Sequence, residues 1–413
     1  MPTRAAPPSA TATQPPAWVM LKSGPPSAKQ GLPVSSMRRG ERHPAAAASA
    51  SSSSRPARNA WRSIGRRKRA ARSASVAGSC AAKRSSTGSA RSRSASQATR
   101  VPDSDALPPL LFMLPGSGVE VPGMGRSLLA DRSFADSIAQ CDEAARPSFA
   151  QPLRAFLDGT AEDGEPGYRS AALAAFCIAS AAALNDRGVR ADGWLGCSIG
   201  EIAALAIAGA MSLEDAFAFI AAQARAIAQV APRGTLLFAL GEPALEDAAR
   251  YWTDAHLAGV YAPGLLLFAA TDADIDRVMA RAQAEGAVAQ RVPVPTPVHS
   301  PLIDPAQTLV AAAAEAVRWQ GPGVLLSAAA GGKIAAADAG HLWRVVRAAI
   351  RFDRAIQAAA PGTIAIDIGP SGALTSAARR ATNGRVRALA IGGARGPDAA
   401  GLDRIAGQCR HPA

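Results

Sequence analysis

A sharp turn around one serine most constrains how this chain folds. Gly196, Ser198 and Gly200 form a G-x-S-x-G pattern between a short apolar segment and an Ala-rich stretch. Glycine lacks a Cβ, so a strand can turn tightly into a helix there and expose the serine hydroxyl at the apex. The helix expected from Glu201 to Ala210 directs its amide groups and its positive dipole end at that apex. The pattern indicates a nucleophilic serine, although glycines also flank serine in ordinary turns.

Positive charge is concentrated in the first hundred residues. They contain 19 Lys and Arg but only one acidic residue, Glu41, whereas the remainder carries 26 basic and 31 acidic residues. The net charge of +13 therefore does not indicate nucleic-acid binding by the folded part. Residues 1–105 are rich in Ala, Ser, Pro and Arg without a helical or strand period, which predicts a disordered basic low-complexity tail. Such a tail fits a dispensable or wrongly assigned upstream extension, an organellar transit peptide, or a nucleic-acid or nuclear-import segment.

Cysteine usage argues against metal and disulfide sites. The five cysteines form no C-x-x-C pair and their number is odd, so we expect no metal site, no disulfide framework and a cytoplasmic, reducing compartment. No run of 18 apolar residues occurs, and the opening residues lack the apolar core of a signal peptide. We therefore expect no membrane span.

Apolar runs alternate with helical patterns from Leu110 onward. This alternation predicts an α/β fold with a hydrolase-like core and a parallel sheet. Within residues 232–296, the order strand, helix, strand, strand, helix, strand predicts an inserted ferredoxin-like α+β subdomain. The expected parts are one domain at 106–396, with a large part at 106–231 and 297–396 and a small part at 232–296, followed by a C-terminal tail at 397–413.

A serine hydroxyl needs an adjacent base to act as a nucleophile, and the chain has five histidines. His43 lies in the basic tail, and His411 lies almost at the end of the chain. His256 and His341 lie at the ends of predicted helices, which indicates surface or capping residues. His299 follows a predicted strand in a Pro-rich loop, where a rigid backbone can hold an imidazole. His299 is therefore the candidate base; the alternative is a loop histidine bonded to a nearby carbonyl.

Further motifs follow one another in a consistent order. They are Pro115-Gly116-Ser117-Gly118, Gly123-Met124-Gly125, the serine turn with Glu201, and His299-Ser300-Pro301. With these motifs, the region from about Leu110 to about Ile391 resembles the acyltransferase family of fatty acid and polyketide synthesis, whose type member is malonyl-CoA:acyl-carrier-protein transacylase. Several spaced motifs in the same order are more specific than any one of them.

The resemblance implies that Ser198 takes an acyl group from a thioester while His299 removes its proton. The backbone N–H groups of Ser117 and Ile199 would bind the oxyanion, and the backbone carbonyl of Val345 would orient the base. An acyl-serine ester and ping-pong kinetics would follow. The resemblance implies no permanently bound cofactor. The substrates would be phosphopantetheine thioesters, namely acyl-CoA and acyl carrier protein, and we expect a monomer.

The chain departs from the family pattern at several positions of the site. Cys197 stands where His is usual, which is expected to alter the substrate pocket; Cys197 as the nucleophile is a weaker alternative. Gln223 stands where dicarboxylate-specific members place an Arg, and a neutral amide cannot supply that charge. Arg225 is the alternative residue to bind a substrate carboxylate, if the spacing from Ser198 differs by a helical turn from the one counted. Ser117 replaces a usual Gln, and Ser371 replaces a common His.

The missing Arg predicts an uncharged acyl group. Transfer of that group to a carrier thiol is the predicted reaction. The alternative is hydrolysis of the acyl-serine, which resembles the stand-alone acyl hydrolases of polyketide pathways. Two rival interpretations are an α/β-hydrolase esterase with Ser198, Asp338 and His341, and a non-catalytic pseudo-enzyme that docks a carrier protein.

Overall fold

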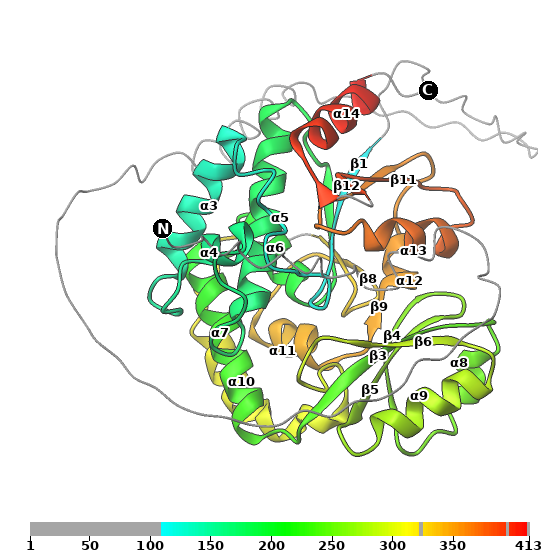
Figure 1. Ribbon diagram of the computed structural model, residues 1–413. Helices are drawn as coiled ribbons and strands as arrows, with labels where there is room; N and C mark the ends of the chain where they lie inside the picture. Colours follow the sequence, from blue (N-terminus) through cyan, green and yellow to red (C-terminus); the bar gives the residue numbers. More distant parts are fainter. Residues whose placement is uncertain (1–108, 322–324, 394–395, 411–413) are drawn as a thin grey trace, which may run out of the picture. The chain divides into compact units, whose positions relative to one another are not determined.

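The computed structural model describes residues 109–321, 325–393 and 396–410 (Figure 1). Within these ranges, two main sheets, a short two-stranded sheet and the surrounding helices form the molecule. The α/β class and the antiparallel second subdomain confirm the predicted fold. The predicted disordered tail at residues 1–105 lies outside the described residues.

The larger sheet has the strand order β11-β10-β1-β2-β7-β8. Its strands are β1 (Leu110–Leu114), β2 (Gly193–Gly196), β7 (Leu325–Ser327), β8 (Gly332–Ile334), β10 (Ile364–Asp367) and β11 (Arg387–Ala390). All neighbours are parallel except β7 and β8. β1 lies between β10 and β2, and a parallel strand covered on both faces requires the continuous apolar run of its sequence. The carboxyl ends of β1 and β2 therefore lie at one edge, where Leu114 pairs with Gly196.

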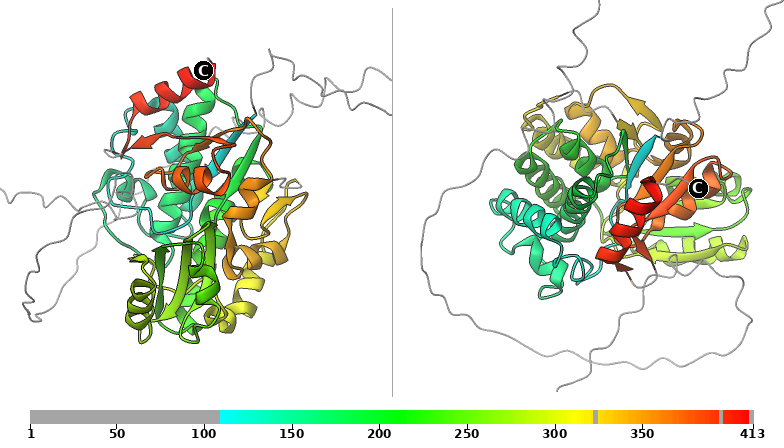
Figure 2. Two further views of the ribbon diagram at one scale, coloured as in Figure 1. Left: turned by 90° about the vertical axis from the view of Figure 1, so that its right-hand side faces the viewer. Right: turned by 90° about the horizontal axis from the view of Figure 1, so that it is seen from above.

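Helices cover the large sheet on both faces (Figures 1 and 2). The helices of the large part are α3 (Arg132–Ala145), α4 (Leu153–Asp158), α5 (Tyr168–Asp186), α6 (Ile199–Ile207), α7 (Leu213–Val230), the 3₁₀ helix η1 (Pro301–Ala306), α10 (Gln307–Glu315), α11 (Ala339–Arg347), α12 (Phe352–Gln357), α13 (Ala373–Ala381) and α14 (Ala399–Arg410), and some of them pack on other helices rather than on the sheet. Because strand side chains alternate between faces, Phe112 and Leu114 pack with the apolar faces of α3, α5 and α6. Leu111 and Met113 pack on the opposite face with α13 and the second sheet.

The second sheet belongs to the small part of the molecule. Its elements are β3 (Gly234–Leu240), α8 (Leu245–Ala249), β4 (His256–Ala262), β5 (Leu265–Thr271), α9 (Ile275–Ala284) and β6 (Val288–Val292). The strand order β6-β3-β5-β4, with every pair antiparallel, is that of a ferredoxin-like sheet. A fifth strand, β9 (Ile350–Arg351), joins beside β4 in parallel. β9 comes from the large part of the chain, so backbone hydrogen bonds connect the two parts directly.

Three local predictions differ from the structure. Residues 399–410 form α14 rather than part of a C-terminal tail, because Leu402, Ile405 and Cys409 recur at helical spacing and are buried. Residues 122–130 form a series of turns, and α4 was not predicted. A short antiparallel pair, β12 (Gly392–Gly393) and β13 (Gly396–Pro397), precedes α14. In the part of the chain that the structure describes, no helix is long and apolar enough to cross a membrane.

Candidate active site

Ser198 occupies the turn between β2 and α6 in a strained backbone conformation. Its φ is +53°, a region that non-glycine residues rarely adopt and that costs on the order of 1–3 kcal/mol. A Cβ on Gly196 would overlap the backbone of Glu201, and a Cβ on Gly200 would overlap the carbonyl oxygen of Leu114. Both glycines are therefore required for the tight turn that exposes the Ser198 hydroxyl.

His299 lies against Ser198 and is held by two backbone carbonyls. Its Nε2 lies 2.9 Å from Ser198 Oγ, and its Nδ1 lies 3.0 Å from the carbonyl oxygen of Ala348. The backbone N–H of His299 donates to the Val346 carbonyl at 3.0 Å. A carbonyl oxygen only accepts, so Nδ1 carries the ring proton and Nε2 is free to accept a proton from the serine.

The carbonyl that orients the base belongs to Ala348, so the prediction of Val345 is wrong. Val345 lies inside α11, where backbone carbonyls point along the helix axis, and its side chain lines the cavity instead. Ala348 follows the last turn in an extended conformation, with φ −71° and ψ 146°. Its carbonyl is therefore turned away from the helix, and the last carbonyls of a helix lack intrahelical partners.

Burial keeps His299 in its neutral form. Desolvation lowers the pKa of His299 from 6.5 to about 4, and the hydrogen bond with Ala348 opposes this effect only in part. A neutral imidazole at neutral pH is the form that a general base requires. Like Ser198, His299 has a positive φ, at +61°, and these are two of the three described non-glycine residues in that region.

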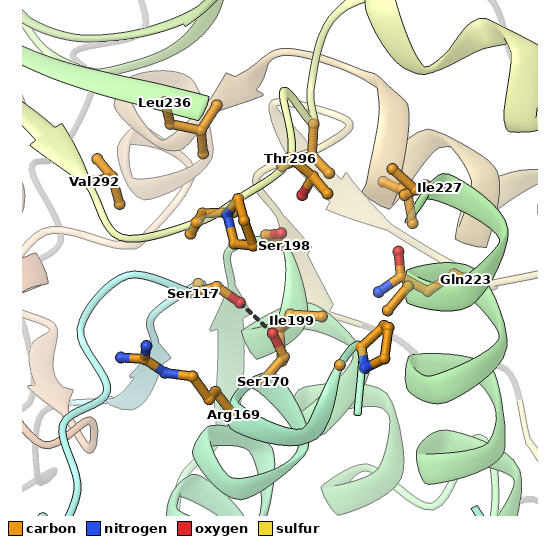
Figure 3. A pocket seen from close by; sticks show the side chains of 18 of the residues that line it. Ser117, Arg169, Ser170, Ser198, Ile199, Gln223, Ile227, Leu236, Val292 and Thr296 are labelled. Atoms are coloured by element: carbon orange, nitrogen blue, oxygen red, sulfur yellow. Dashed lines mark hydrogen bonds between the residues drawn. The ribbon is translucent and has the colours of Figure 1, made fainter. Parts of the chain in front are cut away.

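The predicted oxyanion donors are the backbone N–H groups of Ser117 and Ile199, and both residues line the same cavity as Ser198. Ile199 is the first residue of α6, so its N–H has no acceptor within the helix. The Ser117 hydroxyl lies 2.8 Å from that of Ser170 (Figure 3), which holds the loop that carries the Ser117 N–H. The carboxylate of Glu120 accepts the N–H groups of Gly118 and Val119 at 2.6 and 2.9 Å. Burial raises the pKa of Glu120, although these bonds oppose the shift.

A cavity of about 460 Å³, the main cavity, opens beside Ser198 (Figure 3). Its apolar walls include Ile199, Ile202, Ile227, Leu236, Val292 and Val345. Gln223 projects into it from α7 and is only 6% exposed, with Nε2 donating to the Ile220 carbonyl at 3.4 Å. The guanidinium of Arg169 points away from Gln223 and donates to the Glu120 carbonyl at 3.2 Å.

The structure removes Cys197 from the substrate-binding residues. Cys197 directly follows β2 and belongs to the same buried apolar cluster as Leu195, which also contains residues of the small part. It is fully buried and does not line the main cavity. Burial also raises the pKa of its thiol, which disfavours a thiolate nucleophile.

Arg225 is likewise not positioned as a clamp. It does not line the main cavity, and its guanidinium donates to the backbone carbonyl of Ser148. Residues two apart on a helix point in different directions, so Gln223 alone of the two faces the cavity.

A buried Glu–His pair was not predicted from the sequence. Glu201 and His341 are 0% and 3% exposed, and Glu201 Oε1 lies 2.7 Å from His341 Nε2. His341 is thus neither a surface residue nor part of an esterase triad. Asp338 caps α11 by accepting the His341 N–H at 2.7 Å. No local sequence signal shows that residues 140 positions apart would meet.

The chain is similar to known proteins over most of its length. The acyl transferase domain family matches residues 111–404. The chain is 29% identical over 284 residues to the polyketide biosynthesis acyltransferase homolog BaeD of Bacillus velezensis, covering 66% of this chain and 87% of BaeD. It is 31% identical over 308 residues to the polyketide biosynthesis protein ThaF of Burkholderia thailandensis, covering 71% of this chain but only 26% of ThaF.

Solved structures share the fold. The acyltransferase domain from the second module of the salinomycin polyketide synthase superposes with a TM-score of 0.65 at 26% identity, covering 74% of each chain. The chain is 33% identical over 197 residues to the erythronolide synthase EryA3 of Saccharopolyspora erythraea, and the match covers 47% of this chain but only 6% of EryA3. The family match over residues 111–404, together with the serine turn and the fold, shows that the chain belongs to the acyl transferase domain family.

Proposed function

We propose that the chain transfers an acyl group between phosphopantetheine thiols through an acyl-serine on Ser198. The observation that carries this proposal is the chain of contacts from Ser198 Oγ to His299 Nε2 and from His299 Nδ1 to the Ala348 carbonyl, at 2.9 and 3.0 Å. A neutral, oriented imidazole beside a hydroxyl is the arrangement that activates a serine.

In the first step, Ser198 Oγ attacks the thioester carbonyl carbon while His299 takes the hydroxyl proton. The N–H groups of Ser117 and Ile199 stabilise the oxyanion, a contribution worth about 10²–10³ in rate per donor. The carbon–sulfur bond then breaks, and His299 returns the proton to the leaving thiol. An acceptor thiol, from CoA or an acyl carrier protein, reverses these steps and removes the acyl group.

The acyl group that best fits the main cavity is uncharged. Gln223 is neutral, and Arg225 lies outside the cavity. Arg169 and Arg233 line the cavity, but Arg169 donates to the Glu120 carbonyl and Arg233 is paired with Asp272 at 3.4 Å. A malonyl carboxylate without a countercharge would lose several kcal/mol on desolvation. Ile202 and Ile227 provide apolar surface for acetyl or longer chains.

Intact-mass spectrometry of the full-length protein tests the proposal. We would incubate it with acetyl-, octanoyl- and malonyl-CoA, then add an acyl carrier protein. We expect a stable acetyl or octanoyl adduct that moves to the carrier. Cys197→Ala should retain the adduct and Ser198→Ala should lose it.

Each other outcome has a definite meaning. An adduct that survives Ser198→Ala would contradict the serine mechanism. A brief adduct with accumulating free acid would identify a hydrolase that edits acyl groups. A stable malonyl adduct would contradict the role assigned to Gln223, and no adduct from any thioester would support a non-catalytic protein.

A further inference from the structure

The buried pair of Glu201 and His341 joins the two helices that carry the parts of the site. Glu201 lies in the first turn of α6, directly after the serine turn, and His341 lies in the first turn of α11. The two helices also pack on each other. Neither residue lines the main cavity, so an effect of the pair on the reaction must pass through other groups.

The hydrogen bonds around His341 fix its tautomer and the direction of its ring. A guanidinium only donates, so Arg344 Nη1 donates to His341 Nδ1 at 3.4 Å. The ring proton is therefore on Nε2, which donates to the Glu201 carboxylate at 2.7 Å. The second oxygen of Glu201 accepts the Ala329 N–H at 3.4 Å, and Asp338 accepts the backbone N–H of His341. These partners hold both side chains in one orientation.

The opposite end of α11 holds the base. The carbonyls of Val346 and Ala348 accept the backbone N–H and the Nδ1–H of His299, both at 3.0 Å. His341 and Ala348 are about 10 Å apart along the helix, at a rise of 1.5 Å per residue. Because a packed helix moves as a rigid body, a shift at the start of α11 also moves the carbonyls that hold His299.

These contacts close a ring around the nucleophile and the base. The ring runs from Ser198 along the first turn of α6 to Glu201 and across to His341. It continues along α11 to Ala348, whose carbonyl holds His299, and returns to Ser198 over 2.9 Å. Apolar packing between helices is non-directional, whereas a hydrogen bond fixes a distance and an angle. The pair therefore supplies the register between α6 and α11.

We propose that Glu201 and His341 are positioning residues that set the distance between Ser198 and His299. They do so by holding the start of α11 against the first turn of α6. The inference rests on the proposed function for the identity of the reaction, but it applies to any attack by Ser198 that His299 assists. Loss of the pair should slow the chemical step and leave substrate binding unchanged.

The test removes the pair without leaving a buried charge. Removing one partner alone strands the other in the interior and is strongly destabilising, so Glu201→Met is combined with His341→Leu. Thermal unfolding of the full-length double variant establishes that it is folded. Single-turnover acylation by acetyl-CoA, followed by intact-mass spectrometry, should show a maximal rate about 10²-fold lower, as expected for a displacement of about 1 Å. The half-saturating concentration of acetyl-CoA should not change.

Conservative single variants should restore the rate. Glu201→Gln keeps an oxygen that accepts from His341, and His341→Gln places an amide N–H near the position of Nε2. Each should keep the acylation rate within about fivefold of the unaltered protein, because the hydrogen bond between the helices is retained.

A second mostly buried pair provides a matched control. Arg187 lies 2.7 Å from Asp131, with side chains that are 17% and 10% exposed, and neither residue lines the main cavity. Arg187→Gln should lower the stability of the protein and leave the acylation rate unchanged.

Two further measurements separate positioning from a merely structural role. In a His299→Ala background, the double variant should cost no further rate, because the pair acts through His299. A fluorophosphonate supplies a reaction without a thioester: Ser198 Oγ bonds to phosphorus, fluoride leaves, and His299 takes the hydroxyl proton. Its labelling rate should fall by the same factor as acylation.

The remaining outcomes distinguish this inference from the proposed function. An unchanged acylation rate in the folded double variant, or an equal loss in the His299→Ala background, would contradict positioning and leave the proposed function intact. Fluorophosphonate labelling that depends on the pair, in a protein that no thioester acylates, would support positioning and contradict the proposed function. An unaltered protein that reacts with neither probe would contradict both.

Discussion

Ser198 and His299 meet at 2.9 Å, but the chain holds them in different ways. Ser198 is held by its own neighbours, because Gly196 and Gly200 permit a turn that no side chain would fit. His299 is held from a distance, because its ring and its backbone bind the carbonyls of Ala348 and Val346, nearly fifty residues later. Both residues have positive φ. A local motif and a tertiary contact can thus impose the same kind of strained backbone, and only the first is visible in sequence.

Removing either member of the pair tests whether the two act as one unit. Ser198→Ala should lower the acylation rate by about 10⁴-fold or more, and His299→Ala should cause a similar loss, because neither group is effective alone. The double variant should be no slower than the worse single variant. Single-turnover acylation measures all three, and additive losses would show that His299 does not activate Ser198.

The local constraint on the serine turn can be tested through stability. Gly200→Ala places a methyl group against the Leu114 carbonyl oxygen, and we expect a loss of about 3 kcal/mol or more in the free energy of unfolding because backbone cannot move aside cheaply. Gly407→Ala is the control, since nothing lies near that position in α14; it should stabilise slightly, by about 0.5–1 kcal/mol. Urea unfolding measures the free energy of unfolding of both variants. If Gly200→Ala is as stable as Gly407→Ala, the serine turn can relax to accept a methyl group.

The tertiary constraint on His299 predicts an unusual pH dependence. The active form is neutral, and burial places the pKa of His299 at about 4, so kcat/KM should stay level from pH 8 to about pH 5 and fall only as pH approaches 4. A histidine of ordinary pKa near 6.5 would already lose about tenfold by pH 5.5. Because the folded-state pKa is lowered, stability should also decline as pH falls below 6.5. A midpoint near 6.5 in the rate profile would mean that His299 is solvated.

The smallest expected effect is on the choice between malonyl and acetyl groups. Gln223→Arg should raise the ratio of malonyl to acetyl loading about tenfold, because the new guanidinium faces the main cavity and can pair with a carboxylate. Competition between acetyl-CoA and malonyl-CoA, followed by mass spectrometry, measures the ratio. Arg225→Gln is the matched control and should not alter it, since Arg225 lies outside the cavity. If Arg225→Gln changes the ratio of malonyl to acetyl loading and Gln223→Arg does not, Arg225 is the residue that faces the acyl group.

Much of the fold could be predicted because its signals are local. The apolar run Leu110–Leu114 and the strand–helix order of residues 232–296 predict the central strand and the ferredoxin-like sheet that the structure contains. α14 was missed although its apolar spacing is visible, because the prediction treated the end of the chain as a tail. β9 carries too short a signal, two residues, to be predicted as a strand of the small sheet.

The residues of the site likewise fall into those with a local sequence signal and those whose position depends on tertiary contacts. The sequence by itself determined Ser198 and the two glycines around it, because steric exclusion acts between residues only a few positions apart. It also indicated His299, through elimination among few histidines and a rigid loop. Only the tertiary structure decided that Ala348 orients the base, that Cys197 faces away from the cavity, and that Glu201 meets His341. Those outcomes depend on which carbonyl a helix end leaves free and which face of a sheet a side chain meets, and both are set by packing between distant segments.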